Sequence, residues 1–294
     1  MSELPAYAAP QAPPVCPRHP DRVSYVRCQR CGRPVCPECQ RPAAVGVQCV
    51  DCVKEQARTA RSTRTVFGGS VTGTPVVSTA IVALCVVVFV LQQVLPGFTD
   101  QIVFDPGAAR AQPWRFLTAA FAHASVTHIL FNMIALWAVG AQYLERLLGA
   151  ARYAAVYLVS ALGGSVVYML FSSPPPIPYA PPDQQFWGSP TVGASGAVFG
   201  LFGAMLVLNR HLGRSSAGMY ATIAINAVIG FVVPNIAWQA HLGGLLTGAA
   251  IAAVIAWSSS PARRRWQWPG VGLVVVVLVV LAVAKYAATT TVGY

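Results

Sequence analysis

Seven long apolar segments, nearly free of charged residues, constrain this chain of 294 residues more than any other feature. Most are long enough to cross the roughly 30 Å hydrocarbon core of a bilayer as a helix. A backbone in lipid must satisfy its hydrogen bonds internally, so each segment is predicted to be helical. The segments are 76–95, 127–146, 153–171, 194–209, 217–233, 239–257 and 270–287. The sequence therefore predicts an all-α membrane protein.

The composition and the distribution of charge agree with this prediction. Charged residues make up 10% of the chain, whereas soluble domains have about a quarter. The net charge of +11 does not indicate a nucleic-acid partner, because ten of the twenty basic residues lie between Arg18 and Arg64, beside the first span. If the N-terminus is cytoplasmic, 17 of the 20 basic residues lie on the cytoplasmic side, where lysine and arginine concentrate. The C-terminus is then predicted to lie outside. No secretory signal is recognisable through Pro14, so the first span is expected to direct membrane insertion.

Seven cysteines and one histidine before residue 53 form four pairs with two residues between the members. These pairs are Cys16 and His19, Cys28 and Cys31, Cys36 and Cys39, and Cys49 and Cys52. Eight soft ligands are the number that two tetrahedral Zn²⁺ sites require. A disulfide cluster is the alternative, but cytoplasmic thiols stay reduced. The pattern resembles B-box-type zinc fingers. That resemblance implies cross-bracing, in which pairs one and three share one zinc and pairs two and four share the other.

Composition also divides the chain into regions. We expect a disordered Pro/Ala-rich tail, a double-zinc cytoplasmic module that binds an unidentified protein partner, a basic linker, a core of six spans, and an Arg-rich cytoplasmic loop with a seventh span. Their bounds are 1–14, 15–55, 56–75, 76–257 and 258–294. The connector 172–190 has six prolines before Phe186 and is predicted not to be helical. Cys85, alone in the first span, is interpreted as a small apolar residue.

Among the residues of the predicted spans, four ionisable or strongly polar ones stand out, and such groups in a membrane usually have a function. They are His128, Asn132, Ser195 and His241. At about 1.5 Å per residue from the predicted cytoplasmic ends, all four lie about 20–26 Å into the bilayer, in one layer. The fourth segment, 194–209, is about 24 Å long and too short to cross alone. The loop before it is therefore expected to enter the protein and line a water-filled cavity.

This layer suggests nucleophilic catalysis. Ser195 stands between Gly193 and Gly196, small residues that let a substrate backbone approach its hydroxyl. A serine needs a neighbouring base, and His241 is the candidate at the same depth. No aspartate lies in the spans to orient the imidazole, so a Ser–His dyad is favoured over a triad.

Small residues indicate how the two helices approach each other. The Gly244-x-x-x-Gly248 spacing is typical of close helix contacts in membranes. We expect these glycines to pack against Gly200 and Gly203 of the fourth span, which would bring the serine and the histidine together.

The motifs around these residues resemble the rhomboid family of intramembrane serine proteases, in order and in topology. They are Gly193-Ala194-Ser195-Gly196, Ala240-His241-Leu242-Gly243-Gly244, His128-Ile129-Leu130-Phe131-Asn132 and Trp114-Arg115. The resemblance covers about residues 76 to 257. It implies a six-helix core, with the seventh helix and the zinc module as additions, and no cofactor for catalysis. It also implies transmembrane proteins as substrates, cleaved near the outer ends of their helices. The location that it implies is a bacterial inner membrane, with an organelle membrane as the alternative.

The resemblance also implies roles for individual residues. Ser195 would be the nucleophile and His241 the general base. The Ser195 backbone N–H would form an oxyanion hole with the side chains of His128 and Asn132, which the i, i+4 spacing puts on one helix face. Phe199, one turn after the serine, would stack on the imidazole. Trp114-Arg115 would anchor the loop before the second span.

Other interpretations of the same residues remain. A serine at a helix start is often an N-cap, and a single histidine in a span is often structural. His123, in the loop before His128, is interpreted as structural. A non-catalytic rhomboid-like protein that binds or escorts membrane helices is the main alternative function. A transporter or channel has less support, because no inverted repeat is recognisable.

Overall fold

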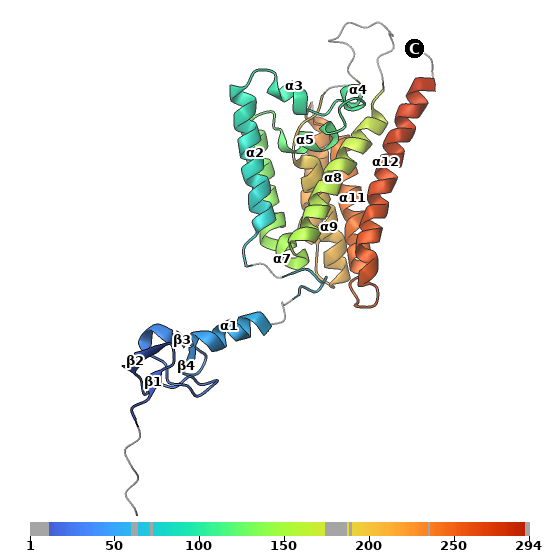
Figure 1. Cartoon of the computed structure of the whole chain (residues 1–294). Coiled ribbons are helices and arrows are strands. Elements are labelled where there is room, and N and C mark those ends of the chain that lie inside the picture. The colour runs from blue at the N-terminus through green and yellow to red at the C-terminus, as the bar shows by residue number, and fades with distance from the viewer. Residues whose placement is uncertain are drawn as a thin grey trace, which may run out of the picture. The chain divides into compact units, whose positions relative to one another are not determined.

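The computed structural model describes residues 12–59, 64–70, 73–173, 187, 190–234 and 236–291. The chain divides into two compact units, Met1–Ser62 (the N-terminal unit) and Thr63–Tyr294 (the helical unit), which Figure 1 shows as ribbons. Most of the predicted tail 1–14 and of the proline-rich connector 172–190 lies outside the described residues.

The N-terminal unit consists of two short antiparallel hairpins, a 3-10 turn and one helix. The elements are β1 (Val15–Cys16), β2 (His19–Val23), η1 (Pro37–Cys39), β3 (Gln40–Pro42), β4 (Val47–Cys49) and α1 (Val50–Thr59). β1 pairs with β2, and β3 pairs with β4. Its buried apolar side chains are cysteines together with Val35. So small a core cannot supply much folding free energy without cross-links or bound metal.

Among its described residues the helical unit contains seven long helical segments, and its connectors contain short helices. The long elements are α2 (Val76–Val94), the continuous run α6 (Val126–Ala135), η3 (Leu136–Leu144) and α7 (Glu145–Leu148), then α8 (Ala150–Phe171), α9 (Ser195–His211), α10 (Ala217–Val232), α11 (Trp238–Trp257) and α12 (Gln267–Thr291). The short elements are α3 (Phe98–Ile102), α4 (Pro106–Ala109), α5 (Arg115–Thr118), η2 (Ala119–Phe121) and η5 (Arg264–Trp266). Each of the seven apolar segments of the sequence is thus helical.

Five stretches of the described residues are long and apolar enough to cross a membrane. They are Val76–Val94, Val126–Leu148, Ala150–Phe171, Trp238–Trp257 and Arg264–Thr289. The other two predicted spans are the shorter helices α9, with 17 residues, and α10, with 16. The short α9 agrees with the prediction that the chain before it enters the protein. The second span contains a feature that the sequence did not predict, because η3 is a π-helix.

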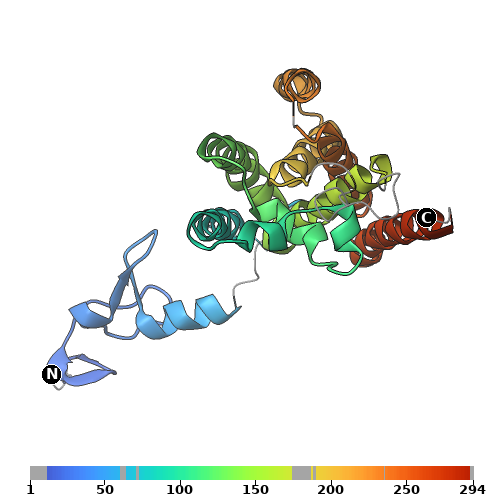
Figure 2. The same ribbon diagram turned by 90° about the horizontal axis from the view of Figure 1, so that it is seen from above.

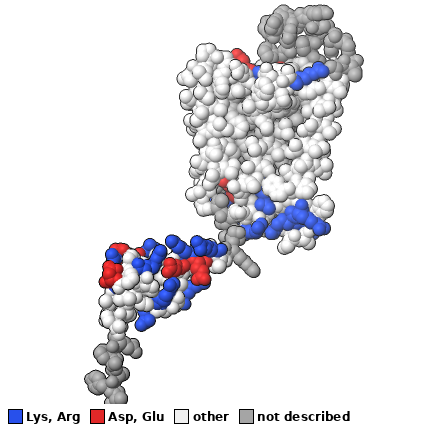
Figure 3. Space-filling model, viewed as in Figure 1, with Lys and Arg blue, Asp and Glu red and all other residues white. Residues whose placement is uncertain are grey.

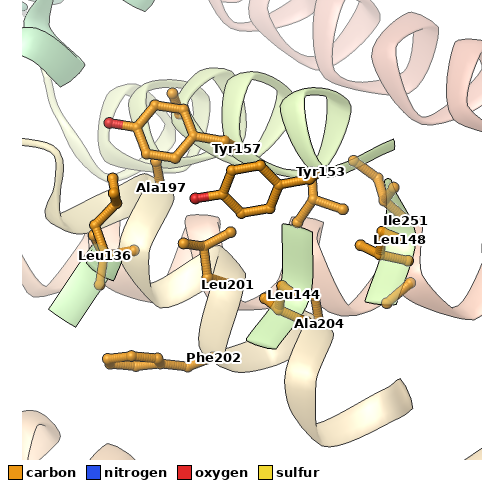
Figure 4. Close-up of a cluster of buried hydrophobic side chains, with 14 of the residues drawn as sticks. Leu136, Leu144, Leu148, Tyr153, Tyr157, Ala197, Leu201, Phe202, Ala204 and Ile251 are labelled. Atoms are coloured by element: carbon orange, nitrogen blue, oxygen red, sulfur yellow. The ribbon is translucent and has the colours of Figure 1, made fainter. Parts of the chain in front are cut away.

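The centre of the helical unit is formed by α8, α9 and α11, which pack more extensively on one another than on other elements. Figure 4 shows this core, in which Tyr153 and Tyr157 of α8 lie near Leu201 of α9 and Ile251 of α11. All four side chains are fully buried. By contrast, α10 buries only Gly230 and lies at the edge of the unit (Figure 2).

Glycines hold α9 and α11 at backbone contact. A β-carbon on Gly244 would lie 1.8 Å from the Gly196 carbonyl oxygen, and one on Gly248 would lie 2.0 Å from that of Gly200. The prediction of close packing is therefore right, and so is Gly200 as a partner, because a β-carbon on it would lie 3.0 Å from the Gly244 carbonyl oxygen. Gly203 is wrong as a partner, and Gly196 was not predicted as one. Gly203 instead adjoins the Leu245 carbonyl oxygen. Gly196, Gly200 and Gly203 share one helix face, so sequence spacing alone cannot select the register.

Glu145, at the start of α7, caps the N-terminus of α2. Its fully buried carboxylate accepts hydrogen bonds from the Val77 N–H at 2.8 Å, the Ser78 N–H at 2.8 Å and the Ser78 hydroxyl at 2.7 Å. The first N–H groups of a helix have no partner within it, and a carboxylate there is stabilised by the helix dipole. This contact fixes the first span against the second.

The seventh helix, α12, is hydrogen-bonded to the rest of the helical unit near both ends. At its start, Gln267 accepts from Arg152 Nε at 2.8 Å and donates to the Phe67 carbonyl at 3.2 Å. Towards its end, Tyr286 donates to the Pro106 carbonyl at 2.7 Å. This helix is therefore an integral part of the unit.

Candidate active site and candidate metal centres

Ser195 is the first residue of α9, and the chain before it is held from two sides. Thr191 and Phe104 exchange both backbone hydrogen bonds, at 2.8 and 2.9 Å, and Gly193 donates its N–H to the Ala119 carbonyl at 2.9 Å. Gly193 has a φ of +129°, which other residues rarely adopt. The serine hydroxyl is half-buried, so it remains accessible from the cleft described below.

The structure brings Ser195 and His241 together. His241 Nε2 lies 2.8 Å from Ser195 Oγ, which is hydrogen-bonding distance. The imidazole is stacked on the Phe199 ring, with 4.2 Å between ring centroids and 7° between the planes. The aromatic ring therefore fixes the plane in which the imidazole meets the hydroxyl.

His128 of α6 lies next to the same hydroxyl. A β-carbon on Gly193 would lie 2.8 Å from His128 Nε2 and 3.5 Å from Ser195 Oγ, so only glycine leaves room for the imidazole here. His128 Nδ1 accepts the Ala124 N–H at 3.3 Å. A neutral imidazole whose Nδ1 is an acceptor carries its proton on Nε2. A hydrogen-bond donor therefore faces the serine.

Asn132, one turn further along α6, is buried, and its side-chain amide donates one hydrogen bond within its own helix. Its Nδ2 donates to the His128 carbonyl at 2.9 Å. A side-chain amide has two N–H donors, so the second can serve another acceptor. The same bond ties the amide to the turn that carries the His128 imidazole.

A cleft opens beside Ser195 and is lined mainly by small residues from several elements. They include Ala119, Ala161, Gly164, Ser165, Gly193 and Ala240. Small side chains leave the space over the hydroxyl open, and the carbonyl and hydroxyl groups among them can bind a peptide or water. The cleft, with room of about 30 Å³ for water-sized molecules, therefore gives water access to the Ser195 hydroxyl.

The loop between α2 and α6 is fixed by the predicted anchor and by a residue that sequence reasoning missed. Buried Arg115 donates to the Val103 carbonyl at 2.8 Å, and half-exposed Trp114 donates to the Gln101 carbonyl at 3.3 Å. Buried Asp105 accepts the Ala108 N–H at 2.8 Å and the Trp187 N–H at 3.1 Å. It thus ties the chain before Ser195 to this loop. The sequence feature that could have revealed Asp105 is Asp105-Pro106, because aspartate is a favoured N-cap and proline is favoured at the first helical position.

His123, interpreted from the sequence as structural, is buried beside the site. Its backbone N–H donates to Gln92 Oε1 at 2.9 Å, and its ring lies 5.2 Å from that of His128. Burial is the main cause that lowers the pKa of His123, to about 4, and the neighbouring His128 adds to it. A neutral His123 puts no positive charge beside the donor that faces Ser195.

In the N-terminal unit the eight predicted metal ligands gather into two clusters. The first holds Cys16, His19, Cys36 and Cys39, and the second holds Cys28, Cys31, Cys49 and Cys52. Within each cluster the ligand atoms lie within 4.8 Å of one another. This is the cross-braced grouping that the B-box resemblance implies.

The distances within the clusters fit a tetrahedral Zn²⁺ ion. Ligands about 2.3 Å from zinc at tetrahedral angles put two sulfurs about 3.8 Å apart, and Cys31 Sγ and Cys49 Sγ are 3.8 Å apart. His19 Nδ1 lies 3.2 Å from Cys36 Sγ and 3.4 Å from Cys39 Sγ. The residues present therefore fit two zinc ions.

At three of the seven ligand cysteines, Cys16, Cys28 and Cys31, local hydrogen bonds favour the thiolate form that metal binding needs. Backbone N–H groups, that of Cys36 first, lower the pKa of the Cys16 thiol to about 6. In the second cluster the Cys49 N–H donates to Cys28 Sγ at 3.2 Å, and Arg33 donates to Cys31 Sγ at 3.3 Å. Donors that contact the ligand sulfurs in this way orient metal ligands and stabilise their charge.

Comparison with known proteins agrees with the arrangement of the helical unit. The family model described as the rhomboid domain matches residues 110–258, the part of the chain that holds His128, Asn132, Ser195 and His241. The chain belongs to the rhomboid family. The resemblance inferred from the sequence and the all-α membrane fold are thereby confirmed.

Two of the relatives that this rhomboid resembles carry protease names. It is 33% identical over 195 residues to "Rhomboid protease GluP" of Bacillus subtilis (strain 168), which covers 62% of this chain and 35% of the relative. It is 35% identical over 150 residues to "Putative rhomboid protease YdcA" of the same organism, covering 49% and 68%. It is 34% identical over 151 residues to "RHOMBOID-like protein 6, mitochondrial" of Arabidopsis thaliana, covering 49% and 44%. The matched part is thus only about a third of the GluP chain.

Proposed function

We propose that this rhomboid is an intramembrane serine endopeptidase in which Ser195 is the nucleophile and His241 the general base. The single observation that carries the proposal is the 2.8 Å contact between Ser195 Oγ and His241 Nε2. A serine hydroxyl becomes nucleophilic when a positioned base takes its proton, which contributes about 10²- to 10⁴-fold to the rate. The relatives with protease names support the same reaction class.

In the first step Ser195 Oγ attacks the scissile carbonyl carbon while its proton passes to His241 Nε2. The imidazolium then returns this proton to the leaving amine, and the C–N bond breaks to leave an acyl-enzyme. A water molecule in the cleft next gives its proton to Nε2 and attacks the acyl carbon. Collapse of that intermediate returns the proton to Ser195 Oγ and releases the new carboxylate. Phe199 keeps the imidazole plane fixed through these transfers.

The negative oxygen of each tetrahedral intermediate is stabilised by donors around Ser195. Its backbone N–H begins a helix, so it has no partner within that helix. His128 Nε2–H and the second N–H of Asn132 are the other two donors. Loss of one such donor typically costs about 10²- to 10³-fold in rate.

The proposed substrates are transmembrane proteins, cut near the outer end of a membrane helix. Ser195 lies at the start of a 17-residue helix, about 25 Å from its other end, in a cleft of small residues. Small or helix-breaking residues in the substrate would let its backbone unwind to reach the hydroxyl. The proposal sets the protein in a bacterial inner membrane with its N-terminus in the cytoplasm and its C-terminus outside.

For the N-terminal unit we propose two structural zinc ions and a cytoplasmic protein partner. The ligand clusters support the zinc ions, because the distances fit and all eight ligands would be used. A zinc ion with four protein ligands has no open position for catalysis. Zinc analysis of the purified protein should give two ions per chain, and a zinc-free, folded unit would refute the proposal.

Cleavage of a model transmembrane substrate in proteoliposomes tests the enzyme proposal. Ser195→Ala and His241→Ala should each lower the rate by about 10³-fold or more, with the thermal unfolding midpoint little changed. Ser215→Ala and His211→Ala, the matched controls outside the cleft, should cleave normally. Unchanged cleavage in either dyad variant would refute the dyad. A wild-type protein that binds the substrate without ever cutting it would support the escort alternative.

A further inference from the structure

Three arginines from separate segments converge at the end of the helical unit where α12 begins. Arg64 donates to the Gly68 carbonyl at 3.3 Å, and the Arg264 guanidinium packs on the same glycine, where a β-carbon would lie 2.7 Å from Nε. Both guanidinium groups are close enough to repel that of Arg152, near the start of α8. Figure 3 shows basic side chains gathered at this end of the unit.

No carboxylate neutralises this cluster within the part of the chain that the structure describes. All ion pairs of the described residues lie in the N-terminal unit. The arginines donate to uncharged groups instead, Arg152 to Gln267 Oε1 at 2.8 Å and Arg264 to the Ser259 carbonyl at 3.1 Å. The Nε of Arg264 is buried and has no hydrogen-bond partner. Three neighbouring positive charges repel one another, so a bound anion would stabilise them.

The surroundings of the cluster are those of a membrane interface. The Arg152 guanidinium lies 5.9 Å from the ring centroid of half-exposed Trp268, and Arg263 and Arg265 lie over two further tryptophans. Tryptophans concentrate where the headgroups meet the hydrocarbon. A narrow cleft between α8, α11 and α12 continues from here and is lined by Arg152, Ala155, Ile255, Gln267, Trp268 and Val271. Apolar side chains therefore adjoin the Arg152 guanidinium directly.

We propose that Arg64, Arg152 and Arg264 bind the phosphate of an anionic phospholipid whose acyl chains lie against the apolar faces of α8 and α12. Guanidinium groups suit phosphate because they donate in pairs to its oxygens. Basic pockets between membrane helices are known to hold anionic headgroups. A lipid in this position would join α12 to the catalytic helices. A free phosphate ion would satisfy the arginines equally but would make no use of the apolar surface beside them.

Native mass spectrometry of the full-length protein in detergent tests the site. The probes are phosphatidylglycerol, phosphatidylcholine with the same acyl chains, and inorganic phosphate as a competitor. We expect the protein to retain one tightly bound phosphatidylglycerol molecule and to bind phosphatidylcholine at least about tenfold more weakly. Excess inorganic phosphate should not displace the bound phosphatidylglycerol. Equal retention of both lipids would overturn the proposal, and so would displacement by inorganic phosphate, which would indicate a site for the free ion.

Substitutions separate the site from the general surface charge. Arg152→Gln and Arg264→Gln should each weaken phosphatidylglycerol binding about tenfold. Arg265→Gln removes the same charge from the same loop and should change binding by less than about twofold. If Arg152→Gln is too unstable to purify, Arg152→Lys replaces it, because lysine keeps the positive charge. This variant should retain part of the affinity for phosphatidylglycerol. An equal loss in Arg265→Gln would refute a defined site, because it would show that only the total charge matters.

Discussion

Substitution of Gly244 by alanine should disable the site through the backbone, without touching a reacting group. The added β-carbon would lie 1.8 Å from the Gly196 carbonyl oxygen, whereas carbon and oxygen normally approach no closer than about 3.3 Å. The two helices must therefore separate by about 1.5 Å next to Ser195. A separation of that size would take Oγ and His241 Nε2 from 2.8 Å to beyond hydrogen-bonding distance.

We expect Gly244→Ala to lower kcat on a model transmembrane substrate by about 10²-fold or more, because a misplacement of about 1 Å is enough for such a loss. Cleavage is measured in proteoliposomes, and the thermal unfolding midpoint is measured on the same preparations. The overpacking should also lower stability by about 1–3 kcal/mol. Assays well below the unfolding midpoint separate the effect on the rate from unfolding.

Two further alanine substitutions serve as controls. Gly272→Ala, in α12, has no atom within 4 Å of the new β-carbon and should behave as wild type. Gly248→Ala meets the Gly200 carbonyl at 2.0 Å, one turn further from Ser195. It should lower stability as much as Gly244→Ala but the rate by clearly less. Wild-type activity in Gly244→Ala, or equal rates in the two strained variants, would refute the reasoning.

Three other predictions concern the cap, the stacked ring and the metal. Glu145→Gln should lower the free energy of unfolding by about 2 kcal/mol, whereas the same change at an exposed site, Asp100→Asn, should leave it unchanged. Equal thermal unfolding midpoints for the two variants would contradict the role of Glu145 as the cap of α2. Phe199→Ala should lower kcat about tenfold while Phe199→Tyr keeps it, and a wild-type rate for the alanine variant would show that stacking is dispensable. Chelation of zinc should unfold residues 12–59 by circular dichroism and leave the helical unit's midpoint unchanged. Cys36→Ser should retain one of the two zinc ions, and retention of both would contradict the grouping.

The sequence was sufficient for the features that depend on local composition. Apolar length predicted every long helix, since lipid leaves the backbone no alternative. The short fourth span predicted that Ser195 would follow a chain segment that enters the protein, and the described residues 190–194 do so. The two-residue spacing of the metal ligands predicted the clusters, and the B-box resemblance implied how the pairs combine.

Features that depend on tertiary packing could not be predicted in this way. The π-helix η3 contains no proline or other local signal, so its geometry depends on the packing of its neighbours. Gly196 was missed as a partner of Gly244 and Gly203 was named in its place, because three glycines of α9 share a face. Asp105 gives a local capping signal, but its contact with Trp187 joins positions 82 residues apart. Long-range pairings of this kind are invisible in a single sequence.

The central claim is that the Ser195 hydroxyl is a nucleophile activated by His241, and labelling with a fluorophosphonate probe tests it most directly. Mass spectrometry of the labelled, full-length protein should find the phosphonate on Ser195. The labelling rate should fall by about 10²-fold or more in His241→Ala. An unlabelled Ser195 in protein that still cleaves its substrate, or equal labelling with and without His241, would contradict the account.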